Sequence, residues 1–259
     1  MRLRSLLATT LVLAACGAVH AQPSPTVTWR VSAGRDLFRF RDIARSRPPV
    51  DGSPVDWRGT GPIVTVENDR ERELRRRRWG FAVSGVDDFV YETGVGAVVR
   101  PSEESSTFIE GHYDRRRYFR RPVLRVLRAG IGLSGVGEYR VLRHRPAGVE
   151  LTETDTTGSL VGVLALRVRP LGRVAAEAEW GNAATLARSR QHHVGGEIRD
   201  SSSWGAGWFS DLATRVDVAI AARAALFVAY GSRGEGRLFD HRAYTDERRR
   251  VMVGFAYGR

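Results

Sequence analysis

The C-terminal stretch "RRRVMVGFAYGR", residues 248–259, gives the first indication of the fold. From Val251 onward every second residue is large and apolar, ending with Phe255 and Tyr257, and Met, Gly or Ala residues stand between them. Such two-residue alternation predicts a β-strand with one apolar face. That face could meet the core of a soluble sandwich or the lipid around a membrane barrel, so the rest of the chain has to distinguish the two.

The same alternation recurs along the chain, and after the N-terminus no apolar run is long enough for a membrane helix. In "GRVAAEAEWG", Val174, Ala178 and Trp180 share one face, and Glu177 and Glu179 share the other. Ten such segments are predicted as strands, at about residues 26–38, 61–70, 78–91, 107–117, 124–142, 158–169, 172–183, 206–221, 224–237 and 248–258.

The connections between these segments alternate long and short. Four are long, at about 39–60, 92–106, 143–157 and 184–205, whereas "RPLG" and "ARAA" are tight turns. Membrane barrels have long outer loops, short periplasmic turns, an even strand number and both termini inside. We therefore predict an all-β fold, a closed antiparallel up-and-down transmembrane β-barrel of about ten strands, with eight or twelve as alternatives.

The N-terminus predicts export from the cytoplasm. "MRLRSLLATTLVLAACGAVHAQ" has two Arg, a short apolar run and then small residues, as in a secretory signal. We favour cleavage after Ala21, which leaves 22–259 as the barrel domain; lipidation at Cys16 is the alternative. Since Cys16 is the only cysteine, no disulfide can form within the chain. The expected location is the outer membrane of a Gram-negative cell.

The composition is basic, with 41 basic against 29 acidic residues and a net charge of +12. Every basic residue is Arg. These residues form short clusters between apolar strands and match no nucleic-acid-binding motif. We therefore expect no nucleic acid as a partner.

The polar faces of the strands mix small residues with both charge signs, which suits a narrow barrel interior where Arg pairs with carboxylates. We expect a plugged or very narrow lumen whose charge network is a candidate ligand-binding site. Its predicted members are Arg128, Glu138, Arg140, Glu177, Glu179, Arg215, Asp217 and Arg233.

Aromatic residues near the strand ends are typical of the girdles of membrane barrels. The candidates are Trp29, Trp79, Trp180, Trp208, Tyr230, Phe255 and Tyr257. The clusters "RERELRRRR" (70–78) and "RRRYFRR" (115–121) are expected in inner turns. Arg248 to Arg250 are expected near the outer rim, where Arg could bind lipopolysaccharide phosphates; solvated charge that keeps turns out of lipid is the plainer interpretation of all three clusters.

Several stretches together resemble a family of small bacterial outer-membrane β-barrel proteins of unassigned function. They are "AGRDLFRFRD", the "GP" that opens the next strand, "RAGIGLSGVGEYRVL", "LALRVRPLGRVAAEAEWG" and "VMVGFAYG". The resemblance implies a fold and a location but no activity. Such chains commonly end on an aromatic residue that the barrel-assembly machinery reads, whereas here Gly258 and Arg259 follow Tyr257.

One long connection holds the best candidates for catalysis. "RQHHVGGEIRDSSSW" (190–204) contains His192, His193, Glu197, Asp200 and Ser201. A His beside carboxylates could act as a general base, but the spacing matches no known signature. Exposed polar loop residues are therefore the default, and we expect no metal, no cofactor and no enzyme.

Three functions follow from these observations. The first is a monomeric outer-membrane barrel with a structural, envelope or surface-interaction role, whose partners are membrane lipid, lipopolysaccharide and, during biogenesis, the barrel-assembly machinery. The second is an outer-membrane enzyme with a rim site at 184–205 that acts on lipid A or peptides. The third is a soluble periplasmic barrel that binds an apolar ligand, which requires Val174, Ala178 and Trp180 to face inward.

Overall fold

The computed structural model describes residues 26–45, 54–86, 88–93, 98–99, 104–120, 126–144, 149–194, 197–200, 206–239 and 242–258. The predicted signal segment 1–21, with both candidate processing sites at Cys16 and Ala21, lies outside these residues. Within them there is no helix long and apolar enough to cross a membrane.

Thirteen strands run in chain order along the described residues. They are β1 (Thr26–Arg45), β2 (Pro54–Arg72), β3 (Arg75–Val86), β4 (Asp88–Thr93), β5 (Val98–Val99), β6 (Glu104–Tyr118), β7 (Leu127–His144), β8 (Val149–Leu171), β9 (Val174–Val194), β10 (Glu197–Asp200), β11 (Ala206–Ala221), β12 (Ala224–Phe239) and β13 (Arg242–Gly258).

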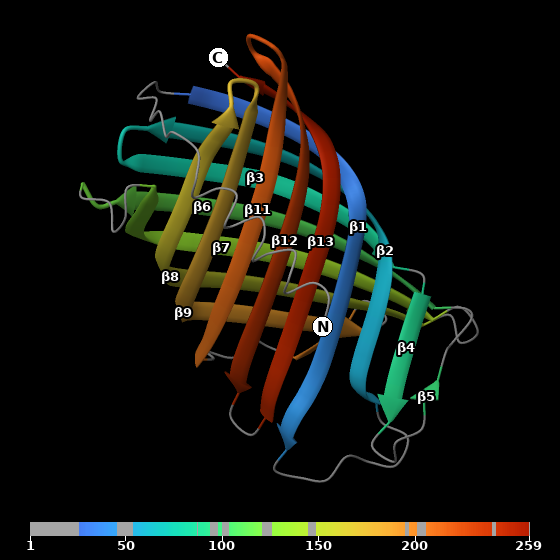
Figure 1. The fold of residues 1–259 in the computed structure, drawn as a ribbon. Helices are drawn as coiled ribbons and strands as arrows, with labels where there is room; N and C mark the ends of the chain where they lie inside the picture. The colour runs from blue at the N-terminus through green and yellow to red at the C-terminus, as the bar shows by residue number, and fades with distance from the viewer. Residues whose placement is uncertain are drawn as a thin grey trace.

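The strands close into one antiparallel barrel (Figure 1). The order around the ring is β1, β13, β12, β11, β9, β8, β7, β6, β3 and β2, and β2 pairs again with β1. β4 pairs with β2 beyond the point where β3 ends, so it takes the same place in the ring as β3. The short strands β5 and β10 pair with β4 and β9. The predicted ten-stranded up-and-down transmembrane barrel is therefore confirmed.

The two ends of the barrel differ in their connections. At one end β2–β3, β8–β9 and β11–β12 are joined by two residues each, and the described chain begins and ends there, with Thr28 opposite Gly258. We call this the short-turn end. The longer β6–β7 connection also lies there, because the end of β6 at Tyr118 pairs with Gly130 near the start of β7. The remaining connections lie at the opposite end, which we call the long-loop end.

The predicted long loops are shorter than expected, because the strands continue into them. β1 extends to Arg45, β2 begins at Pro54, and β9 runs to Val194 before β10 pairs back onto it. A bilayer needs only about 9–11 residues per tilted strand. The extra residues stay in the sheet because neighbouring strands supply partners for their backbone groups.

The apolar faces of the strands point away from the barrel axis. Val253 is 59% exposed and Trp180 is 45% exposed, whereas Glu179, next to Trp180, is 2% exposed. Every strand of the ring carries at least one large exposed apolar side chain. The third function, a soluble barrel with an apolar interior, is therefore wrong, since it required these faces to point inward.

Aromatic side chains form a row near the short-turn end. The register aligns Tyr257, Trp29, Asn68, Trp79 and Tyr113 across β13, β1, β2, β3 and β6. The rings of Trp29 and Trp79 meet edge to face with centroids 5.2 Å apart. Such a row is the position of an aromatic girdle in membrane barrels.

In the closing strand, Gly254 faces the lumen and leaves space for a neighbour. A Cβ at Gly254 would lie 2.6 Å from the ring of Phe227 and 2.4 Å from the Val31 carbonyl oxygen. Phe227 is buried and fills the space that Gly254 leaves. Gly231, which also faces the lumen, has no atom within 4 Å of the position that a methyl group would take.

We predict that Gly254→Ala lowers the free energy of unfolding by about 1–3 kcal/mol, because the methyl group overpacks the wall against Phe227. Gly231→Ala is the matched control and should change stability by less than about 0.5 kcal/mol. Urea unfolding of the detergent-folded barrel, followed by tryptophan fluorescence, measures both. Equal effects of the two substitutions would contradict this packing.

Candidate functional site

The lumen holds charged side chains because the alternation that turns apolar residues outward turns polar ones inward. On β3, Arg76 and Arg78 face the lumen, followed by Gly80, Ala82 and Ser84 at the same parity. On β9, Glu177 and Glu179 occupy the lumen face. Inside the barrel these charged groups must find partners of opposite charge, and they share the lumen with a buried apolar cluster that includes Val161, Val163 and Phe209.

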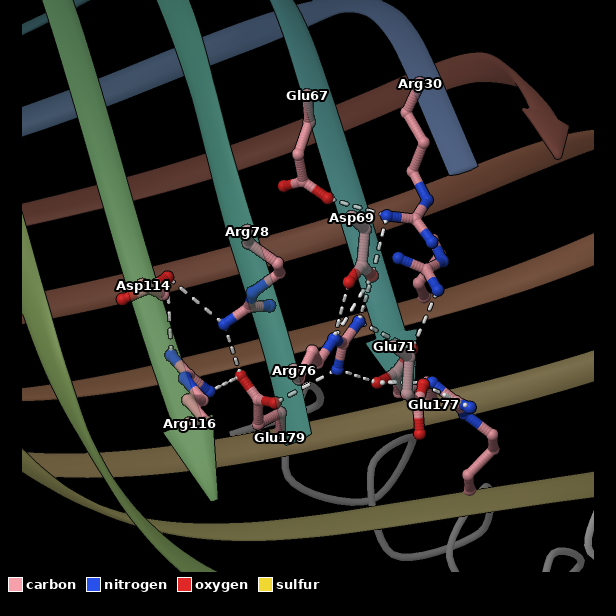
Figure 2. A network of polar contacts seen from close by, with 12 residues as sticks. Arg30, Glu67, Asp69, Glu71, Arg76, Arg78, Asp114, Arg116, Glu177 and Glu179 are labelled. Carbon is pink, nitrogen blue, oxygen red and sulfur yellow. Dashed lines mark hydrogen bonds and ion pairs between the residues drawn. The ribbon is translucent and has the colours of Figure 1, made fainter. Parts of the chain in front are cut away.

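Arg76 is the centre of this arrangement (Figure 2). Its guanidinium is 2% exposed and pairs with Asp69 on β2 at 2.5 Å and with Glu179 on β9 at 3.2 Å. It also pairs with Glu177. β9 lies four places from β3 and five from β2 in the ring of ten, so Arg76 links opposite walls of the barrel.

Glu179 is the most heavily contacted carboxylate. Arg78 donates to it at 2.7 Å and the hydroxyl of Tyr118 at 3.1 Å, and Arg116 also pairs with it. Both oxygens of Glu179 are therefore occupied by donors. Since Arg116 lies on β6, this carboxylate extends the connection between opposite walls from β2, β3 and β9 to a fourth strand.

Further charges surround this centre. Arg30 pairs with Glu67 at 2.7 Å and with Asp69 at 3.0 Å, and Arg215 donates to Glu177 at 2.7 Å. We name the whole set the inner network; its members are Arg30, Arg76, Arg78, Arg116, Arg128, Arg167 and Arg215 with Glu67, Asp69, Glu71, Asp114, Glu177, Glu179 and Asp217. Seven arginines thus face seven carboxylates, and the network is neutral.

A second cluster, the outer network, lies toward the long-loop end. Glu110 on β6 accepts a bidentate pair from Arg250 at 2.7 and 3.0 Å and a hydrogen bond from Arg248 at 2.7 Å. Arg248 also pairs with Glu138 at 3.1 Å, and Arg250 with Asp36 at 3.4 Å. These contacts again cross the lumen, because β13 lies four places from β6 and five from β7.

Aromatic rings close the space beside the outer network. The guanidinium of Arg248 lies 4.7 Å from the ring centroid of Phe108, which packs on Phe38. A cavity of about 30 Å³ lies among the residues of this network, with room for about two water molecules. At the short-turn end a wider cavity of about 660 Å³ is lined by the small residues of β9, β11 and β12 together with arginines.

The predicted network residues fall into both clusters. Arg128, Glu177, Glu179, Arg215 and Asp217 belong to the inner network. Glu138 belongs to the outer network, and Arg233 lies beside it, 3.8 Å from Glu235 and over the ring of Phe209 at 4.3 Å. Arg140 lies in β7, and its side chain is outside the described part of the chain.

Three central residues are not among the predicted members: Arg76 and Asp69 of the inner network and Glu110 of the outer network. From the sequence, the run 70–78, which contains Arg76, is expected to lie in a charged inner turn. In the structure Arg76 and Arg78 lie on the same strand face as Gly80 and Ala82, two residues apart from one to the next. Asp69 likewise shares the parity of Glu67 and Glu71. Two-residue alternation could therefore have identified these residues as lumen-facing. It is hard to recognise here because, in a run such as residues 75–78, the inward and outward positions are all arginine.

The expected outer-rim cluster at Arg248 to Arg250 is wrong for two of its three residues. Arg248 and Arg250 point into the lumen. Only Arg249 faces outward, and it pairs with Glu247 at 3.6 Å. The physical reason is the strand period, which sends successive residues to opposite faces.

Two arginines near the long-loop end are also paired on the outer wall. Arg39 and Arg41 both contact Asp56, beyond the apolar belt. Partial burial raises the pKa of this carboxyl, but the hydrogen bonds and charge of Arg39, with Arg41, hold the pKa of Asp56 below its ordinary value. Asp56 therefore stays ionised and neutralises part of this charge.

The rim candidates lie in strands and not in a loop. His192 and His193 are in β9, and Glu197 and Asp200 are in β10; their side chains, and all of Ser201, lie outside what the structure describes. The backbone register sets His192 opposite Glu153 of β8 and Asp200 of β10. Among the described residues, no group of three or more His, Cys, Asp or Glu side chains could hold a metal ion.

Comparisons with known proteins relate the chain to outer-membrane barrels through its fold alone. No protein-family model matches the sequence, and no curated protein matches it. The outer membrane protease OmpT from Escherichia coli matches with a TM-score of 0.60 and 7% identity, over 93% of this chain and 99% of that chain. The translocator domain of the autotransporter NalP from Neisseria meningitidis matches at a TM-score of 0.41 and 9% identity, over 98% and 95%.

We predict that Glu179→Gln lowers the free energy of unfolding by about 3 kcal/mol or more, because three buried guanidinium groups lose their shared counter-charge. The control is Glu247→Gln, which removes an exposed pair with Arg249 and should change stability by about 1 kcal/mol or less. Urea unfolding of the folded barrel in detergent measures both. A Glu179→Gln barrel as stable as the control would show that the inner network does not hold the walls together.

Proposed function

We propose that this chain is an integral outer-membrane β-barrel with a lumen closed by ion pairs, and that its role is structural or lies in envelope and surface interactions. One observation carries the proposal: apolar side chains cover the outside of a closed barrel whose inside is charged. Large exposed apolar patches on a soluble monomer are rare. A continuous belt of them is the surface that lipid covers in membrane barrels.

The inner network supports a closed lumen. Arg76 and Glu179, each 2% exposed, meet across the lumen with their partners from β2, β3, β6 and β9. A solute would have to break several charge-assisted hydrogen bonds in order to pass. A lumen held this way suits a structural or surface role better than transport.

The expected partners follow from the same surfaces. Membrane lipid covers the apolar belt, lipopolysaccharide surrounds the long-loop end, and the barrel-assembly machinery inserts the exported chain. Because apolar residues occur on every strand of the ring, lipid can cover the whole wall of a monomer. The short-turn end then faces the periplasm.

We predict that the full-length chain, produced in a Gram-negative host, is recovered in the outer-membrane fraction and migrates differently on gels before and after heating. A chain without residues 1–21 should stay in the cytoplasm. Cell fractionation with antibody detection measures both. Recovery of the full-length chain from the soluble periplasm would reject the proposal.

A second candidate function is a rim enzyme that acts on lipid A or peptides. The backbone register places His192 between Glu153 and Asp200, so one histidine and two acidic residues are neighbours across three strands at the long-loop end. Such a row has the residue types that general acid–base catalysis uses. OmpT carries a protease activity on the same fold, so the architecture is compatible with a rim site.

We predict that, if this second function holds, His192→Ala lowers the rate by at least about 100-fold. His193, which lies opposite Thr152 and Ile198, is the matched control, and His193→Ala should retain the rate within a few fold. The assay follows mass changes of lipid A and cleavage of a peptide library, with gel migration to check folding. Equal rates for the two variants, or no activity of the unaltered protein on either substrate, would eliminate this function.

A further inference from the structure

Six arginines face outward at the short-turn end. All six are exposed: two lie on β2 (Arg70 and Arg72), two on β3 (Arg75 and Arg77) and two on β6 (Arg115 and Arg117). The register aligns them in two rows of three, Arg70 with Arg77 and Arg115, and Arg72 with Arg75 and Arg117. We call this set the arginine grid.

The arginine grid has no counter-charge within the described part of the chain. None of its six guanidinium groups forms an ion pair with a described residue, and neither does Glu73 in the adjoining turn. Like charges directly opposite each other on a sheet repel and destabilise the pair. At the long-loop end most outward arginines have a carboxylate partner, since Arg39 and Arg41 pair with Asp56 and Arg249 pairs with Glu247. Arg35 and Arg58 are exposed there without an ion pair to a described residue, but they lie among these paired groups and form no block of six.

The position of the grid relative to the apolar belt indicates what neutralises it. Along β3 the outward residues run Val83, Phe81, Trp79, Arg77 and Arg75. Toward the short-turn end, the outward side chains of β3 thus change from apolar residues to the girdle residue Trp79 and then to arginines. This order matches the order of acyl chains, interface and headgroups in a bilayer. On β2 and β6 the grid arginines likewise follow outward apolar residues.

The spacing also matches a headgroup layer. Two residues of strand rise roughly 6.6 Å, which at a tilt of about 35–45° separates the two rows by roughly 5 Å along the membrane normal. The headgroup layer on one side of a bilayer is roughly 5–7 Å thick. The two arginines of each strand are therefore separated along the normal by no more than the thickness of this layer.

We propose that the arginine grid is a binding site for anionic phospholipids of the periplasm-facing leaflet. The site rests on the proposed function, which sets the short-turn end at the periplasmic side. The guanidinium groups bind phosphate oxygens in pairs, and the lipid supplies the negative charge that the described wall lacks. In their described residues, β1 and β7 carry no outward arginine beside the grid, so the site is one patch and not a ring.

The test compares the lipids that remain bound to the folded protein, residues 22–259, with those bound to two variants of it. Barrels are inserted into vesicles of phosphatidylcholine and phosphatidylglycerol in equal amounts, extracted in mild detergent, and the retained lipids are counted by native mass spectrometry. The grid variant is Arg75→Gln with Arg77→Gln and Arg115→Gln. The matched control has the same charge loss at the long-loop end, Arg35→Gln with Arg58→Gln and Arg249→Gln.

We expect the unaltered protein and the control to retain phosphatidylglycerol in preference, and the grid variant to lose that preference by about ten-fold or more, since each arginine near an anionic surface contributes roughly five-fold. Equal retention of both lipids by the unaltered protein, or an undiminished preference in the grid variant, would overturn the proposal. A barrel that enters vesicles without any lipid preference refutes only this site, whereas failure to enter any vesicle refutes the membrane location itself.

A salt titration of the unaltered protein keeps the test independent of whether the grid variant folds. The preference for phosphatidylglycerol should disappear at about 1 M salt, where charges are screened beyond roughly 3 Å. A preference that does not change with salt would also overturn the proposal.

Discussion

The pairing of Arg76 with Asp69, Glu177 and Glu179 is the contact on which the interior of this barrel depends. A ten-stranded ring is too narrow to hold a wide aqueous channel, and its interior combines two buried apolar clusters with many charged side chains. Charged groups in such a space need opposite charges within hydrogen-bonding distance. Because the partners of Arg76 come from strands on opposite walls, satisfying its charge also joins the walls.

The segment "RRRRWGFAV" at residues 75–83 shows how one residue type serves two environments. Arg76 and Arg78 enter the inner network and are matched by carboxylates. Arg75 and Arg77, their immediate neighbours, face outward without an ion pair to any described residue. The difference comes from the strand period alone, which sends successive arginines to opposite sides of the barrel wall.

Most of the architecture could be predicted from alternation and loop spacing. The ten-stranded closed barrel and the outward direction of Val253 and Trp180 follow from those two patterns. The strand ends do not, because β1, β2 and β9 continue past the apolar belt through backbone pairing, which leaves no apolar pattern. Glu177 and Glu179 of the inner network are predicted, but their partner Arg76 is not, since it lies in a run of four arginines in which the inward and outward members look alike.

The sequence alone was enough to predict which residues of each strand share a face, because two-residue alternation assigns a face to every residue once one face is known. The closing stretch "VMVGFAYG" thus belongs to a barrel wall, with Val253 and Phe255 outside and Gly254 inside. Only the tertiary structure decided which charges meet, such as Arg250 with Glu110, 140 residues apart. The reason is that partners across a lumen depend on strand register and ring closure, which are set by the whole sheet and not by any local pattern.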